Sequence, residues 1–184
     1  MYDLILRGGW VIDGTGAPRY RADVAVEGET IAAVGSLDGA GAKRVVDVAD
    51  RIVCPGFIDA HVHGDLALLV DPTHEAAIFQ GVTTYIIGQD GCGFAPASPS
   101  TIEYMRQYTA GFSGWFPELV CDWTNLEEYF ARFHRKTSIN IAFLVPNGTV
   151  RMEVMGLEDR PSRPKERAAD RKSTRLNSSH TVIS

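Results

Sequence analysis

Hydrophobic residues in the first 55 positions occur in short runs that predict β-strands. The runs cover residues 4–6, 10–12, 23–27, 30–34 and 44–48. Turn-forming segments such as Gly8-Gly9 and Gly14 to Pro18 separate them. This alternation of short strands and turns is typical of a small β-sandwich or a partial barrel, so we assign residues 1–55 to a first, all-β domain.

From residue 56 the pattern changes to strands that alternate with helices. We predict buried strands over 57–61, 82–87 and 139–145 and helices over 73–80, 100–110 and 124–134. The last two helices begin at capping-box sequences, Ser100-Thr-Ile-Glu103 and Thr124-Asn-Leu-Glu127. Strands that alternate with helices predict a parallel sheet of βαβ units, so the fold class is α/β and residues 56–169 form a second domain.

Composition excludes several classes of protein. The 184 residues are 45% hydrophobic and 22% charged, which is enough for a packed core and argues against a disordered chain. The longest apolar runs are far shorter than the roughly 20 residues of a membrane helix. The first residues lack the pattern of a secretory signal, and three cysteines imply no disulfide framework. We therefore expect a cytoplasmic protein with no membrane partner.

The positive charge is concentrated at the carboxyl end. Residues 160–184 hold 7 Lys and Arg against 2 Asp and Glu, whereas residues 1–159 hold 11 against 21. Basic clusters can bind nucleic acid, but this one lacks aromatic residues for base stacking. Asp170 to His180 instead resembles a translated reading frame of a common sequencing adapter. We expect residues 170–184 to be an artefact, the natural protein to continue beyond Ala169, and nucleic acid not to be a partner.

Candidate metal ligands follow the first two strands of the second domain. His61 and His63 stand at the end of the first predicted strand, where alternate side chains point to the same face. Cys92, between two glycines, follows the next strand, and parallel neighbours would bring it near the histidines. Two imidazoles and a thiolate suit zinc. A buried core thiol is the alternative interpretation of Cys92.

Several motifs resemble a known superfamily. Leu4 to Gly16 and Val53 to His63 are similar to the start of an amidohydrolase-superfamily enzyme. Within that superfamily, Gly81 to Thr84, Gly88 to Pro96 and Asn140 to Pro146 most resemble the N-acyl-D-amino-acid deacylases, or D-aminoacylases. The resemblance covers about residues 3–169.

The resemblance implies a fold and an activity. The fold would be a partial (β/α)₈ metal-dependent hydrolase barrel preceded by a small β-sandwich. The activity would be zinc-dependent hydrolysis of the amide bond of N-acyl-D-amino acids, with His61, His63 and Cys92 as zinc ligands. The catalytic aspartate and two further histidines are expected in the natural continuation of the chain beyond Ala169, and Asn147 stands where the family is expected to have histidine.

Two other functions remain open at this point. A cyclic-amide hydrolase, such as a hydantoinase or dihydroorotase, shares the His-x-His start, although Cys92 disfavours it because those enzymes usually complete their site with a lysine. A non-catalytic metal-binding β-domain would use the histidines as a simple zinc clip. Since a (β/α)₈ barrel takes about 250 residues, we also expect the 184-residue chain by itself to be inactive.

Overall fold

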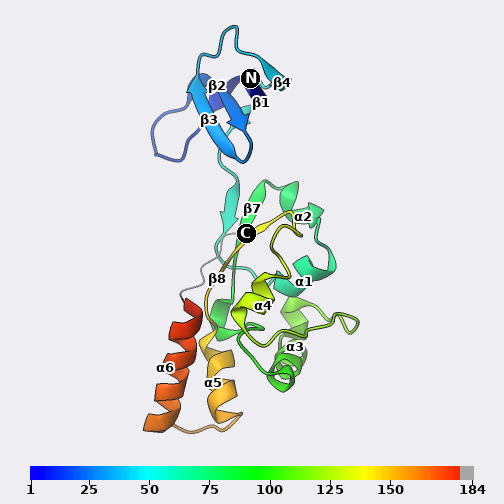
Figure 1. Ribbon diagram of the computed structural model, residues 1–184, viewed down its shortest axis with the longest axis vertical. Helices are drawn as coiled ribbons and strands as arrows, with labels where there is room; N and C mark the ends of the chain where they lie inside the picture. The colour runs from blue at the N-terminus through cyan, green and yellow to red at the C-terminus, as the bar shows by residue number, and fades with distance from the viewer. Residues whose placement is uncertain (179–184) are drawn as a thin grey trace. The chain divides into compact units, whose positions relative to one another are not determined.

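The computed structural model describes residues 1–178 (Figure 1). The chain divides into two compact units, Met1–Pro55 and the part that begins at Gly56. No helix among the described residues is both long enough and apolar enough to cross a membrane.

The first unit is a single five-stranded sheet. Its strands are β1 (Tyr2–Val11), β2 (Tyr20–Glu27), β3 (Thr30–Gly35), β4 (Ala42–Asp47) and β5 (Ile52–Val53). The order is β3-β2-β1-β4, and β5 also pairs with β1. The β1–β2 and β2–β3 pairs are antiparallel, whereas β4 and β5 run parallel to β1. Residues 1–55 thus form one layer, and a second layer is not built within them.

Strand β1 crosses a position where the sequence predicted a break. The pairing of β1 with β2 shifts between Leu6 and Gly9, which is a β-bulge. Gly8 has a φ of 75°, and its amide donates a hydrogen bond to Asp23 Oδ1 at 2.7 Å. The buried Asp23 also accepts a hydrogen bond from the Leu37 amide at 3.1 Å. The prediction of a turn at Gly8-Gly9 was wrong because the carboxylate satisfies the displaced backbone and lets the strand continue.

The second unit contains three parallel strands in the order β6-β7-β8. These are β6 (Phe57–Asp59), β7 (Val82–Ile87) and β8 (Asn140–Phe143). Helices α1 (Asp65–Val70) and α2 (Glu75–Ile78) lie between β6 and β7, and α3 (Pro99–Ser113) and α4 (Leu126–Phe130) lie between β7 and β8. The predicted α/β class is confirmed, and β7 occupies the predicted residues.

A single aromatic-rich core supports this sheet. Trp123, Tyr129 and Phe133 are almost fully buried. The Trp123 indole donates to the Phe94 carbonyl at 2.6 Å, and the Tyr129 hydroxyl donates to Asp65 Oδ2 at 2.7 Å. The polar atoms that these rings bring into the core are therefore paired, as burial requires.

The two helices that were predicted to begin at capping boxes each begin at a different residue. The N-cap of α3 is Ser98, whose hydroxyl accepts from the Thr101 amide, and Pro99 occupies the first turn. The N-cap of α4 is Asn125, which accepts from the Glu128 amide at 2.9 Å. The Glu128 carboxylate accepts from the Thr124 amide in return. Each helix has a side-chain N-cap, but at a residue other than the predicted one, because proline at the first helical position and asparagine as a cap are each favourable.

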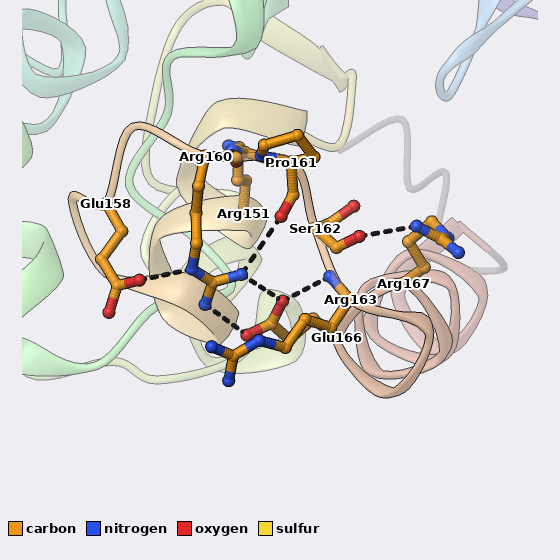
Figure 2. A network of polar contacts seen from close by, with 8 residues as sticks. All are labelled: Arg151, Glu158, Arg160, Pro161, Ser162, Arg163, Glu166 and Arg167. Carbon is orange, nitrogen blue, oxygen red and sulfur yellow. Dashed lines mark hydrogen bonds and ion pairs between the residues drawn. The ribbon is translucent and has the colours of Figure 1, made fainter.

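The last two helices are joined by a network of charged groups. Helix α5 (Asn147–Met155) and helix α6 (Pro164–Ser178) lie side by side in Figure 1. Figure 2 shows Arg160, in the connection between them, paired with Glu158 and held by both oxygens of Glu166, at 2.6 and 2.8 Å. The Arg163 amide also donates to Glu166.

Helix α6 includes the first part of the segment that resembles a sequencing adapter. Residues 179–184 of that segment lie outside the described residues, and the origin of the segment stays a prediction.

This network makes a prediction about titration. The Arg160 guanidinium and the Arg163 amide lower the pKa of Glu166 from 4.5 to about 2. A lowered folded-state pKa means that the network stabilises the fold fully above about pH 4.5 and loses this effect as the pH falls toward 2. In an NMR titration, Arg160→Gln should return the Glu166 pKa toward 4.5. The matched charge change Lys165→Gln should leave it near 2, and an unshifted Glu166 in the unaltered chain would contradict the prediction.

Candidate metal centre

The candidate ligands lie on two loops at one edge of the second sheet. His61 and His63 follow β6, and Asp90 and Cys92 follow β7. Because β6 and β7 are parallel neighbours, the loops at their carboxyl ends meet at the same edge, where α/β proteins usually bind ligands. The structure brings the two histidines and this loop together.

The histidines converge on an aspartate that was not among the predicted ligands. His61 Nε2 and His63 Nε2 lie 3.0 and 3.1 Å from Asp90 Oδ2. Among the described residues, these three form the one group of His, Cys, Asp or Glu donor atoms in which all members lie within 4.8 Å of one another. The side chain of His63 is 20% exposed, whereas those of His61 and Asp90 are about 60% exposed, which leaves the group open to solvent on one side.

The local backbone differs from the prediction. Strand β6 ends at Asp59, so the histidines lie on the following loop and not on the strand. Asp59 Oδ1 accepts from the His61 amide at 3.2 Å, which turns the chain there. The ring of His63 packs against Phe112 of α3 with its centroid 4.6 Å away. The shared orientation of the imidazoles therefore comes from a turn and a ring contact rather than from strand alternation.

Cys92 is not part of the group of three ligand atoms. Its thiol lies 3.8 Å from the Asp90 carbonyl oxygen, and the side chain packs against the core. Burial, and then the charge of Asp90, raise the pKa of this thiol. The assignment of Cys92 as a ligand stays a prediction.

The loop that carries Asp90 is packed against the loop after β8. Gly88, Asp90 and Gly91 all have left-handed backbone, with φ values of 82°, 57° and 74°. A Cβ on Gly88 would lie 2.0 Å from the Leu144 carbonyl oxygen, and one on Gly148 would lie 2.7 Å from the Gly91 carbonyl oxygen. Only glycine permits such close backbone contact, so these residues fix the path of the loop.

A buried glutamine ties this loop to the histidine segment. Gln89 Nε2 donates to the carbonyl oxygens of Ala60 and Ile86, at 2.7 and 2.9 Å. Ala60 is the residue before His61, so one side chain sets the spacing between the two halves of the site. Neither Gln89 nor Asp90 was predicted from the sequence. The available signal was the presence of both polar residues in a glycine loop directly after a buried strand.

Electrostatics favours a charged Asp90. Hydrogen bonds from His61 and then from His63 lower the pKa of Asp90, so it is a carboxylate at neutral pH. Asp65, two residues after His63, differs because burial raises its pKa despite its hydrogen bond from Tyr129. The two carboxylates thus occupy opposite environments, and only Asp90 faces the imidazoles.

The donor set fits a divalent metal. Two imidazole nitrogens and one carboxylate oxygen are ligands found in catalytic zinc sites, which keep a further position for water or substrate. His74, by contrast, contacts the Tyr85 hydroxyl at 2.9 Å and lies outside this group. The side chain of Asn147 at the start of α5 lies against Gly91, on the loop that carries Asp90.

Comparison with known proteins identifies relatives over nearly the whole chain. No family model matches. An N-acyl-D-glutamate deacylase of Alcaligenes xylosoxydans xylosoxydans is 39% identical over 170 residues, which cover 92% of this chain and 34% of that protein. A D-aminoacylase crystal structure, described as defining a novel subset of amidohydrolases, matches 95% of this chain and 36% of its own, at 34% identity and a TM-score of 0.79.

A second solved structure carries a metal. The N-acyl-D-glutamate deacylase of Bordetella bronchiseptica, solved with zinc and a phosphonate inhibitor, is 31% identical over 96% of this chain and 36% of its own, with a TM-score of 0.80. The fold, the site and these relatives place the chain among the amidohydrolases. Within them it is a relative of the D-aminoacylases, the N-acyl-D-amino-acid deacylases, as the motifs predicted. The chain spans about a third of the length of the curated relatives.

The packing of the loop carries a stability prediction. Gly88→Ala should lower the free energy of unfolding by about 2 kcal/mol or more, because the methyl group meets a carbonyl oxygen and the left-handed backbone disfavours alanine. Gly111→Ala in α3 is the matched control, since nothing lies within 4 Å of its added Cβ. The control should stabilise the chain by up to about 1 kcal/mol. Equal urea midpoints for the two variants would show that the loop is not tightly packed.

Proposed function

We propose that these residues are part of a zinc-dependent hydrolase that cleaves the amide bond of N-acyl-D-amino acids. The observation that carries this proposal is the convergence of His61, His63 and Asp90 at the carboxyl edge of a parallel sheet. The relatives support the substrate class, since they are named for the deacylation of N-acyl-D-glutamate and for D-aminoacylase activity.

The same proposal includes the full architecture. Three parallel strands joined through helices are the unit from which a (β/α)₈ barrel is built, and the ligands lie where barrel enzymes place their chemistry. The five-stranded sheet of residues 1–55 would supply the first part of a β-sandwich. Residues 56–169 would then form the first part of the barrel, and the protein would act in the cytoplasm on small molecules.

The residues that are present can be assigned separate chemical roles. His61 and His63 would hold the metal, with a third donor from the loop 88–93. Zinc in such a site supplies Lewis-acid activation of water and of the amide carbonyl. Asp59 and Asp65 are already engaged by the His61 amide and the Tyr129 hydroxyl, so we do not assign either to proton transfer.

Hydrolysis assays test this proposal on the protein encoded by the complete natural reading frame. N-acetyl-D-glutamate and other N-acetyl-D-amino acids should release the free amino acid, whereas the L-enantiomers and hydantoin should not react. A chelator should abolish the release and zinc should restore it. Hydrolysis of hydantoin in place of the D-amino acids would favour a cyclic-amide hydrolase and contradict the deacylase assignment.

Substitution of a histidine gives a sharper prediction. His61→Asn should lower activity by at least about 100-fold because it removes a metal donor. The exposed His134 offers a matched control, and His134→Asn should leave activity unchanged.

The 184-residue chain alone should release no amino acid, because only three parallel strands are formed by its described residues. Measurable hydrolysis by that chain would refute the last expectation.

A further inference from the structure

We propose that the outer face of α3 binds the acyl group of the substrate, with Phe112 next to the metal centre and Tyr108 one helical turn further away. The inference rests on the proposed function for the substrate class. It goes further because it assigns these two rings to one part of the substrate and predicts a preference for longer acyl groups.

A row of aromatic side chains lies along the outer face of α3. Tyr104, Tyr108 and Phe112 follow one another at intervals of four residues, which places them on the same side of the helix. Among the described residues, these side chains are 38%, 64% and 56% exposed. The rings of Tyr104 and Tyr108 are stacked, with centroids 6.1 Å apart. Large apolar groups exposed together in this way mark a binding surface.

The row ends at the candidate metal centre. The centroids of the Phe112 and His63 rings are 4.6 Å apart, and His63 Nε2 lies on the group that His61 and Asp90 complete. A ligand held at these donors would therefore lie beside the Phe112 ring. The space next to Phe112 is open, since a Cβ on Gly111 would meet no described atom within 4 Å. The aromatic face is thus continuous with the site where the amide bond would be cleaved.

The charges around this face favour the acyl group over the other parts of the substrate. An N-acyl-D-amino acid has an anionic carboxylate, and D-glutamate, named for one relative, has a second one in its side chain. The one basic residue of α3 is Arg106, which is buried and paired with Glu103 and the Phe116 carbonyl. Asp90 is itself a carboxylate and repels another. The uncharged acyl group is the part that suits the rings of α3.

The spacing of the two rings predicts how activity depends on acyl length. An α-helix rises 1.5 Å per residue, so Tyr108 lies about 6 Å further along the axis than Phe112. A short acyl group would contact Phe112 alone, whereas one with several more carbons would also reach Tyr108. Burial of one methylene group raises kcat/KM by up to about 4-fold. We therefore expect kcat/KM to rise from acetyl to butyryl and again to octanoyl derivatives.

The experiment measures kcat/KM for the N-acetyl, N-butyryl and N-octanoyl derivatives of the D-amino acid that the complete protein releases fastest. Phe112→Ala should lower the butyryl-to-acetyl ratio by at least about 5-fold, because it removes the ring that the added methylene groups contact. Tyr108→Ala should lower the octanoyl-to-butyryl ratio and leave the butyryl-to-acetyl ratio unchanged. Tyr104→Ala, at an exposed ring two turns from Phe112, is the matched control and should change neither ratio.

Ratios of this kind separate contact with substrate from a structural role. Phe112→Leu, which keeps an apolar side chain, should restore most of the butyryl-to-acetyl ratio. An equal fall in kcat/KM for all three acyl groups would show that Phe112 only positions His63, and it would overturn the inference. A lower melting temperature with unchanged ratios would show that a later part of the natural chain covers this face, and it would overturn the inference as well.

Binding of the acid product gives a readout that needs no turnover. By calorimetry, octanoate should bind the zinc-loaded protein at least about 10-fold more tightly than acetate, and Phe112→Ala should remove most of the difference. Such binding in a protein that hydrolyses no N-acyl-D-amino acid would sustain the apolar subsite and refute the deacylase assignment. Hydrolysis with equal kcat/KM for all acyl lengths would sustain the deacylase assignment and refute the subsite.

Discussion

Close backbone contact between the loops that follow β7 and β8 is the constraint on which the site depends. Parallel pairing brings the ends of these strands together, and the Leu144 amide donates to the Ile87 carbonyl at 2.9 Å. Directly beyond that bond, Gly88 lies so near the Leu144 carbonyl that no side chain fits. The loop after β7 therefore has one path open to it, and that path places Asp90 beside the histidines.

The other half of the site depends on β6 in a comparable way. Asp59 ends that strand and accepts from the His61 amide, which starts the turn that presents both imidazoles. Gln89 then connects the halves, since its buried amide donates to the residue before His61. Two neighbouring strands and one buried glutamine are enough to bring three candidate donors together, so the preorganisation of this part of the site is local.

Much of the second unit could be predicted from sequence because local preference and tertiary packing agree there. The β-branched run Val82–Ile87 is a strand with the predicted bounds. Prediction was weaker where a side chain from elsewhere decides the outcome. Asp23, 15 positions along the chain, stabilises a bulge at Gly8, where the local sequence predicts a turn. Such contacts depend on residues that no local pattern connects.

The same limitation explains why the sequence identified His61, His63 and Cys92 as candidate donors but did not identify Asp90. His61 and His63 are recognisable from spacing, and Cys92 was predicted from its place in a glycine loop after a strand and from the affinity of sulfur for zinc. Ligand chemistry ranks residue types, but the backbone decides which side chains lie near one another. Gly88, Asp90 and Gly91 have left-handed backbone, and this turn places the Asp90 carboxylate beside the imidazoles. An aspartate next to a glycine ordinarily indicates a turn, and here the turn itself directs the carboxylate to the histidines.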